Sequence, residues 1–498
     1  MHNTLYDALI APHAGRGGAF LHCDDGTVVT YDGFVARAAQ MAHVLAEAGV
    51  APGDRIVVQA PKGADTVALY AGALQAGAVY LPLNTGYTLQ ELEYFCRDAD
   101  PRLIICDAAD IAALTPLAAS VGAQVLTLGG PSGSLSRAAS GKPTSFDTVP
   151  RGPDDLAALL YTSGTTGRSK GAMLSHMNLL SNARVLTDLW QITDADRLIH
   201  ALPIFHTHGL FVALNTALLA GSTVRLMARF DLDMILTELP SSTLLMGVPT
   251  FYTRLLAADG FTRDCVQTMR LFISGSAPLL AETHQAFEHR TGHRILERYG
   301  MTETNMITSN PYVGDRVAGT VGFALPGTEV KITDPDTGAT LPPGDIGMIE
   351  VRGSNVFQGY WNMPEKTAEE LREDGFFITG DLAVQDADGR VSIVGRAKDL
   401  IISGGYNIYP KEIEDALNDV DGVSESAVFG VPDPDFGERV MAALVATSDA
   451  LDLDAIRATV EARLARFKHP RAYVVMDALP RNTMGKVQKN VLRAEHTD

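Results

Sequence analysis

Apolar positions in the first 300 residues follow two alternating patterns. The runs RIVVQA (55–60), VYLPL (79–83) and RLIICD (102–107) are short and rich in aliphatic residues, as is typical of buried strands. Between them, residues 65–76 and 89–99 carry apolar side chains at helical spacing. Strands that alternate with helices over short connections predict an α/β fold with parallel sheets covered by helices.

The pattern changes twice in the second half of the chain. From about residue 320, short strands separated by turns predict an antiparallel or barrel-like subdomain. From Lys398 onward, strands and helices mix over about a hundred residues, which predicts a small α+β domain. We therefore expect an N-terminal domain over 1–397 and a C-terminal domain over 398–498. The polar segment 129–155, rich in Gly, Ser and Pro, is expected to be a long surface connection.

Composition and charge exclude several classes of function. The chain has 498 residues and a formal net charge of −19, which argues against nucleic-acid and anionic-membrane partners. Its four cysteines lack metal-binding spacing and are expected to be reduced thiols. No N-terminal signal pattern and no long uncharged apolar run occur, so we expect a soluble cytoplasmic protein.

One polar stretch cannot serve to fill a core. YTSGTTGRSKGAM (161–173) follows the apolar strand LAALLY and combines glycines, hydroxyl side chains, Arg168 and Lys170. Such a loop offers N–H, O–H and ammonium donors at close range, which predicts that it binds a phosphate chain. It is not a P-loop, because Lys170 lies three residues after Gly167 and no Ser or Thr follows the lysine.

The stretch TSGTTGRSKG resembles the signature of the adenylate-forming superfamily, which includes acyl-CoA synthetases, luciferases and peptide-synthetase adenylation domains. Five further motifs of the superfamily occur in order: ALPIFHTHG (201–209), ERYGMTET (297–304), ITGD (378–381), IVGRAKDLIISGGYNIYP (393–410) and PRNTMGKVQK (480–489). The resemblance covers nearly the whole chain. It implies an AMP-forming acid–thiol ligase that attaches a carboxylate to the α-phosphate of ATP and then transfers the acyl group to CoA.

The resemblance also implies where ATP binds. The residues that cradle its β- and γ-phosphates are expected to be Thr162, Ser163, Gly164, Thr165, Thr166, Gly167 and Lys170. The adenine is expected to lie between Gly275, Ser276, Ala277 and Tyr299. The ribose hydroxyls are expected to contact Asp381 and Arg396, because a carboxylate can accept two hydrogen bonds.

The expected catalytic residues are Thr302, Glu303, His206 and Lys486. By the resemblance, Thr302 contacts the α-phosphate and Glu303 ligates Mg²⁺, a cation that prefers oxygen ligands. Lys486 bridges the acid's carboxylate and the α-phosphate, and we expect acylation of Lys486 as a means of regulation.

The resemblance makes the C-terminal domain mobile, with its hinge at Lys398. Rotation at the hinge withdraws Lys486 and presents a CoA-binding surface. The expected CoA-binding residues are Gly404, Gly405, Tyr406, Arg466, Lys468 and Arg471.

Two arguments favour a short dicarboxylate as the acid. The acyl pocket is expected to be edged by His206, Thr207 and Met301. A second carboxylate needs a cation, since an unpaired buried charge is costly. Arg254 is the first candidate for that cation, and Arg168 and Arg229 are the next candidates.

The runs around these motifs also look much like the malonyl-CoA synthetases, whose substrate fits that description. Methylmalonate is a further expected substrate, because one methyl group is worth only about 1–3 kcal/mol of discrimination. A medium-chain or aromatic acyl-CoA ligase, an adenylation domain serving a carrier protein in trans and a non-catalytic nucleotide-binding paralogue stay open as alternatives.

Overall fold

The computed structural model describes residues 2–129, 132–162, 169–403, 406–434, 436–447, 451–482 and 485–497. The first sheet has six strands in the order β6-β5-β3-β4-β7-β8 and is parallel except for the last pair. Its strands are β3 (Arg55–Gln59), β4 (Val79–Pro82), β5 (Leu103–Cys106), β6 (Gln124–Thr127), β7 (Leu156–Thr162) and β8 (Lys170–Ser175).

Helices cover both faces of this sheet. Alternate residues of β3 divide between two apolar clusters: Ile56 packs with α2 (Tyr31–Glu47) and α3 (Ala64–Ala76), and Val57 packs with α4 (Leu89–Ala99) and α5 (Ile111–Ser120). The apolar run of β3 is therefore buried on both sides, as the sequence pattern predicts.

The second sheet has nine strands in the order β15-β14-β13-β12-β11-β9-β10-β1-β2, with a parallel centre and antiparallel edges. Its strands are β1 (Ala19–Cys23), β2 (Val28–Thr30), β9 (Arg197–His200), β10 (Thr223–Leu226), β11 (Leu244–Gly247), β12 (Leu271–Ser274), β13 (Leu296–Met301), β14 (Asn305–Ser309) and β15 (Phe323–Ala324). The helices along this part of the chain are α7 (His176–Leu189), α8 (Asn215–Ala220), α9 (Leu232–Glu238), α10 (Pro249–Leu256) and α11 (Ala281–Thr291). One continuous apolar core joins this sheet to the first.

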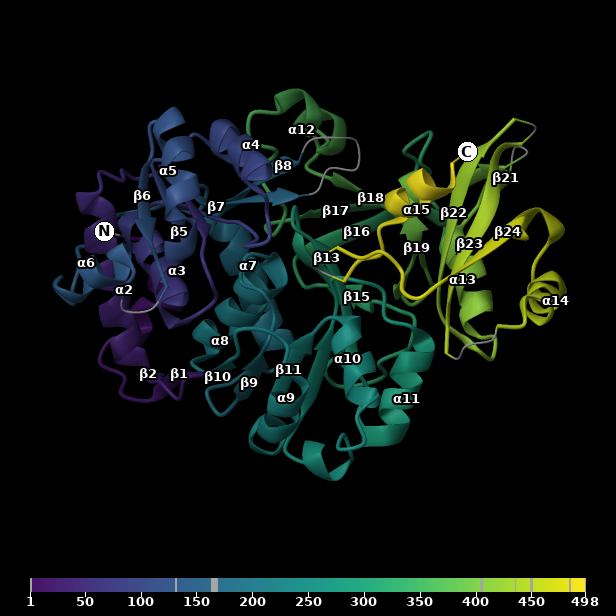
Figure 1. Cartoon of the computed structure of the whole chain (residues 1–498), viewed down its shortest axis with the longest axis horizontal. Helices are drawn as coiled ribbons and strands as arrows, with labels where there is room; N and C mark the ends of the chain where they lie inside the picture. The colour runs from purple at the N-terminus through teal and green to yellow at the C-terminus, as the bar shows by residue number, and fades with distance from the viewer. Residues whose placement is uncertain are drawn as a thin grey trace.

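Two smaller units follow (Figure 1). Strands β16 (Thr328–Thr333), β17 (Ile346–Gly353), β18 (Phe377–Gln385) and β19 (Val391–Arg396) form a four-stranded sheet, with α12 (Pro364–Glu370) between β17 and β18. The expectation of an antiparallel subdomain after residue 320 is confirmed.

The last unit lies at the opposite end of the molecule from the N-terminus (Figure 1). Its five strands are β20 (Ile401–Ser403), β21 (Tyr406–Ile408), β22 (Val423–Asp433), β23 (Gly437–Ala446) and β24 (Ala472–Met476). Its helices are α13 (Pro410–Asn418), α14 (Leu453–Arg463) and α15 (Lys489–His496). Two apolar clusters of its own cover the faces of this sheet.

The connection at 129–155 differs from the sequence expectation. It contains α6 (Ser134–Ser140), whose Leu135 and Ala139 are fully buried in the main core. The description of the segment as a surface connection is therefore wrong for these residues. Two apolar side chains four residues apart suffice to anchor a short helix on α2, although the segment is polar on average.

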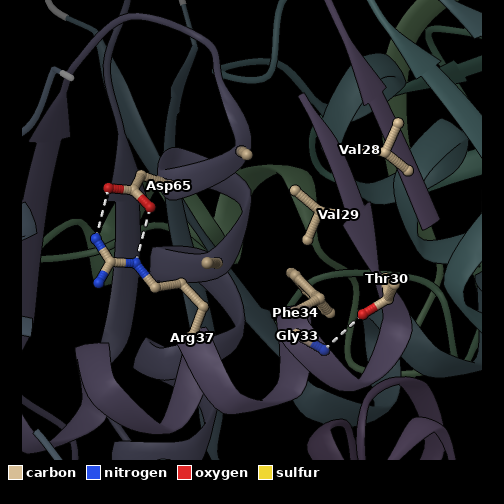
Figure 2. Close-up of a pocket in the computed structure, with 9 residues that line it drawn as sticks. Val28, Val29, Thr30, Gly33, Phe34, Arg37 and Asp65 are labelled. Carbon is tan, nitrogen blue, oxygen red and sulfur yellow. Dashed lines mark hydrogen bonds and ion pairs between the residues drawn. The ribbon is translucent and has the colours of Figure 1, made fainter. Parts of the chain in front are cut away.

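A cavity of about 320 Å³ lies between β2, α2 and α3 (Figure 2). Arg37 and Asp65 form a two-pronged ion pair in its wall, at 2.7 and 2.8 Å. None of the residues that line it belongs to the motifs above. In the described part of the chain, no helix is long and apolar enough to cross a membrane.

Candidate active site

The predicted ribose pair lies on one β-hairpin. Strand register places Asp381 of β18 opposite Arg396 of β19, and the Arg396 Nε lies 3.0 Å from the Asp381 Oδ1. The hydroxyl of Tyr299, on β13, donates to the Asp381 Oδ2 at 2.6 Å. The Asp381 carboxylate raises the pKa of Arg396. The structure thus brings together three of the residues that the resemblance assigned to the nucleoside.

The predicted adenine slot lies at the end of β12. Gly275 is buried, while Ser276 and Ala277 are half-buried. Ser276 has a φ of +72°, a backbone conformation that costs free energy outside glycine and often marks functional sites. Its hydroxyl lies 3.2 Å from the Nδ1 of His208, which connects the slot to the HTHG segment.

Most of the predicted phosphate-binding loop lies outside the described residues. The loop residues outside are Ser163, Gly164, Thr165, Thr166, Gly167 and Arg168. Thr162, the last residue of β7, is paired in register with Lys170, the first residue of β8. The Lys170 Nζ contacts the Tyr360 hydroxyl at 2.9 Å and the Glu370 carboxylate at 3.1 Å.

The predicted metal ligand lies beside this group. Thr302 and Glu303 directly follow β13; the Glu303 side chain is buried, and its Oε1 accepts a hydrogen bond from the Tyr360 hydroxyl at 3.0 Å. Burial raises the pKa of Glu303. No group of three metal-ligating side chains occurs among the described residues. One carboxylate plus substrate phosphates and waters is a ligand set that suits Mg²⁺, so the residues fit this ion.

Lys486 lies in the tight turn that follows Asn482, whose Oδ1 accepts the Lys486 backbone N–H at 3.0 Å. Desolvation, followed by the charge of Arg396, lowers the pKa of Lys486 to about 8, and the carboxylates of Asp381 and Glu303 act in the opposite direction. The lysine from the C-terminal unit is therefore close to both the ribose pair and the metal ligand.

The residues predicted to edge the acyl pocket lie in two places: His206 and Thr207 come just before a short helix, and Met301 is the last residue of β13. Thr207 begins a π-helix over His208–Leu214, a rare element often found at functional sites. Burial, then the charges of Lys486 and Arg298, lowers the pKa of His206 to about 3, so its imidazole is neutral. Met301 is half-buried at the end of β13 and packs against the main core.

Sequence reasoning missed the cation that the structure places in this pocket. Arg298 of β13 is 3 % exposed, and its Nε and Nη2 have no hydrogen-bond partner among the described residues. Burial lowers its pKa to about 9. The adjacent Glu297 is no partner, because its carboxylate accepts the Leu279 N–H at 3.2 Å and strand alternation directs it to the other face.

Space for the Arg298 guanidinium depends on a glycine. A Cβ atom at Gly275 would lie 2.4 Å from the Arg298 Cζ, which is far inside van der Waals contact. The hydroxyl of Thr207 and the Nε2 of His208 are also buried without partners among the described residues. A buried guanidinium beside further unpaired polar atoms has the chemistry of a site for an anion.

The arginines named from the sequence are placed elsewhere. Arg254 is exposed near the end of α10, with its guanidinium carbon 5.3 Å from the centre of the Phe230 ring. Arg229 is also exposed, and Arg168 lies outside the described residues. Among the described residues, no hydrogen bond, ion pair or ring contact joins Arg254 or Arg229 to His206 or Arg298, so the role of Arg254 stays a prediction.

A half-buried lysine supports the HTHG segment. Lys62, just after β3, donates to the Nδ1 and carbonyl of His200 and to the Leu202 carbonyl, at 2.8 to 2.9 Å. The Nε2 of His200 in turn donates to the Gly209 carbonyl at 2.8 Å. Lys62 therefore ties the first sheet to the start of the acyl pocket, and nothing in its local sequence distinguishes it from a surface lysine.

The predicted CoA-binding residues lie on the surface of the C-terminal unit. Tyr406 is exposed and stacks on Phe467 with ring centres 4.5 Å apart. Lys468 pairs with Glu412, and Arg471 lies over the ring of Phe436. Arg466 and the hinge residue Lys398 are also exposed, whereas Gly404 and Gly405 lie outside the described residues.

The fold and the grouped motif residues define an adenylate-forming ligase. Residues 12–361 match the AMP-binding enzyme family and residues 412–486 match the AMP-binding enzyme C-terminal domain. The chain belongs to the AMP-binding enzyme family, and its activity is that of an AMP-forming acyl-CoA synthetase.

Individual relatives of the chain support this assignment. A malonate–CoA ligase of Arabidopsis thaliana is 36% identical over 89% of this chain and 78% of its own length. A feruloyl-CoA synthase of a Streptomyces species is also 36% identical, over 98% of this chain and 96% of its own. The crystal structure of ATP-bound MatB from Rhodopseudomonas palustris superposes with a TM-score of 0.98, at 54% identity, over 100% of this chain and 99% of that one.

Proposed function

We propose that this enzyme joins malonate to CoA. In the first step, a carboxylate oxygen of malonate attacks the α-phosphorus of ATP, and the bond to diphosphate breaks. In the second step, the CoA sulfur attacks the acyl carbon of malonyl-adenylate, the thiol proton is lost and AMP leaves. Both steps move charge between oxygen atoms, so the protein acts mainly by positioning groups and neutralising charge.

The observation that carries the choice of malonate is the buried guanidinium of Arg298, whose Nε and Nη2 have no hydrogen-bond partner among the described residues. A short dicarboxylate with one carboxylate at Lys486 would bring its second carboxylate to this cation. Octanoate or ferulate would instead leave the charge of Arg298 buried without a partner, which is costly. This assigns to Arg298 the role that the sequence alone gave to Arg254. The malonate–CoA ligase of Arabidopsis and the 54% identical MatB support the same choice.

The remaining roles follow the predicted assignments. ATP lies with its ribose at Asp381 and its β- and γ-phosphates at Lys170 and the glycine-rich loop. Glu303 holds Mg²⁺, which supplies charge neutralisation at the phosphates when bound. CoA binds through Tyr406 and the cations around it after the unit beyond Lys398 rotates. Acylation of Lys486 removes the charge that joins the two reactants and therefore stops the first step.

A panel of acids tests the proposal. AMP formation is followed with Mg·ATP and CoA, offering malonate, methylmalonate, succinate, acetate, octanoate and 4-coumarate in parallel. We expect malonate to be used best and methylmalonate to be used as well, since a methyl group changes binding by only about 1–3 kcal/mol. Preference for octanoate or 4-coumarate would contradict the malonate assignment. The absence of AMP with every acid would favour a non-catalytic nucleotide-binding protein.

The lowered pKa of Lys486 predicts a pH dependence. Burial lowers this pKa to about 8, so the ammonium is present below pH 8 and is lost as the pH rises through that value. Only the ammonium can bridge two anions, so we expect kcat/KM for ATP to fall above about pH 8 with the slope of one proton. The fall should disappear in Lys486→Arg, whatever the residual rate. A profile of the unaltered enzyme that stays flat to pH 10 would contradict the assignment.

A further inference from the structure

Four side chains from distant parts of the chain meet where β8 begins. Lys170 is the first residue of β8, Tyr360 lies in the segment before α12, Glu370 is the last residue of α12 and Glu303 follows β13. The Tyr360 hydroxyl lies 2.6 Å from the Glu370 Oε2 and 3.0 Å from the Glu303 Oε1. The Lys170 ammonium contacts both Tyr360 and Glu370.

Backbone pairing fixes this arrangement. The Trp361 N–H donates to the Gly171 carbonyl at 2.7 Å, and the Met173 N–H donates to the Gly359 carbonyl at 3.0 Å. Tyr360 is therefore held as if on an added strand beside β8, opposite Ala172, and it is only 2% exposed. Figure 1 shows α12 next to the start of β8. Backbone pairing therefore places Tyr360 next to the start of β8, within reach of the Lys170 ammonium.

A second cation remains with Glu370 if Lys170 turns away. The Lys366 Nζ lies 3.0 Å from the Glu370 Oε1, one helical turn earlier on α12. The Tyr360 hydroxyl, 2.6 Å from the Glu370 Oε2, can also donate to it, so the carboxylate would not be left unpaired. The departure of Lys170 from Glu370 therefore costs little, because the uncompensated buried charge that makes such a separation expensive does not arise.

Tyr360 restricts how the two carboxylates can be satisfied. A phenol carries one proton, so its hydroxyl donates to either Glu303 or Glu370 at any moment. In this arrangement the Lys170 ammonium satisfies Glu370 and leaves the phenol proton available to Glu303. The four side chains form one unit, so a movement of Lys170 changes the hydrogen bonding of the Glu303 carboxylate.

We propose that Glu370 is a positioning residue that occupies the Lys170 ammonium until the phosphate chain of ATP replaces it. The Glu370 carboxylate is an internal competitor of the β- and γ-phosphates and lowers the affinity for both ATP and diphosphate. The competition holds Lys170 in place before ATP binds and eases the release of diphosphate afterwards. This inference rests on the proposed phosphate role of Lys170 and is independent of which acid is used.

Titration calorimetry of ATP, diphosphate and AMP, with Mg²⁺ and without any acid, tests the proposal. Glu370→Gln keeps the shape and the contact to Tyr360 but removes the competing charge. We expect ATP and diphosphate to bind about 3- to 10-fold more tightly, because the part-buried ion pair between Glu370 and Lys170 no longer has to be broken. The affinity for AMP should stay the same. The matched control is Glu369→Gln, which removes the same charge from the same helix at a side chain whose ion pair is with Lys366.

Two further outcomes separate the possible failures. Weaker or unchanged ATP binding in Glu370→Gln would overturn the proposal, and so would a raised Mg²⁺ requirement, which would make Glu370 a metal ligand instead. Lys170→Ala is expected to weaken ATP and diphosphate binding but not AMP binding. If Lys170→Ala leaves ATP binding unchanged, the proposed phosphate role of Lys170 fails; if only the Glu370→Gln effect is missing, the competition alone fails.

Discussion

Replacing Lys486 by methionine is expected to slow the formation of the acyl-adenylate by about 100- to 1,000-fold, the effect of removing one preorganised charge donor from a closed site. Methionine keeps the length of the side chain and removes its charge. Lys486 is the cation close to Asp381, Arg396 and Glu303 that the mechanism places between two mutually repelling anions. The measurement is the malonate-dependent exchange of labelled diphosphate into ATP, which reports the first step alone.

The second step provides an internal control for Lys486→Met. When malonyl-adenylate and CoA are supplied directly, thioester formation should proceed at close to the normal rate, because the rotation that presents CoA withdraws Lys486. Lys489→Met is the matched variant, since Lys489 lies three residues away and pairs with Glu414 at 2.6 Å. Equal losses in both steps would contradict the assignment of Lys486 to the first step.

Replacing Arg298 by methionine is expected to lower kcat/KM for malonate by about 1,000-fold, because the second carboxylate would be buried without a cation. The affinity for ATP should stay the same, since Arg298 has no predicted contact with the nucleotide. Activity with acetate should be retained or should rise, because the variant pocket no longer holds an unpaired charge. The measurement is AMP formation with each acid at several concentrations.

Arg254→Met is the control for Arg298→Met and compares the two candidate arginines directly. Arg254 is exposed and lies against the ring of Phe230, so its loss should change malonate use by less than about threefold, as for an ordinary surface substitution. A large loss of malonate activity in Arg254→Met, with Arg298→Met little affected, would restore the expectation drawn from the sequence. Equal activity of the unaltered enzyme on acetate and malonate would remove the argument for any cation in the pocket.

Much of the fold could be predicted because the apolar patterns are local and strong. The expected helix over 65–76 is α3 (Ala64–Ala76), and the expected mixture of strands and helices from Lys398 onward is the unit that contains β20 to β24 and α13 to α15. The short helix α6 was missed because its burial depends on contact with α2, which its polar surroundings do not indicate. The domain break at Lys398 stays a prediction.

The site residues also divide into those that sequence motifs identify and those that only the folded structure identifies. Asp381, Arg396 and Tyr299 belong to motifs; strand pairing places Asp381 opposite Arg396, and Tyr299 reaches Asp381 through a side-chain hydrogen bond. Arg298 stands within the motif ERYGMTET, yet its meaning depends on burial and on the lack of a partner, and neither can be read from a sequence. The same holds for Glu370, whose contact with Lys170 joins residues 200 positions apart.

The close approach of Gly275 to Arg298 has a consequence for the evolution of substrate choice. A side chain at position 275 would meet the guanidinium where it now lies, so Arg298 would have to take another conformation. The effect of replacing Gly275 should therefore depend on whether residue 298 is arginine. The two positions are expected to be epistatic, so that a change of substrate in this pocket would involve both.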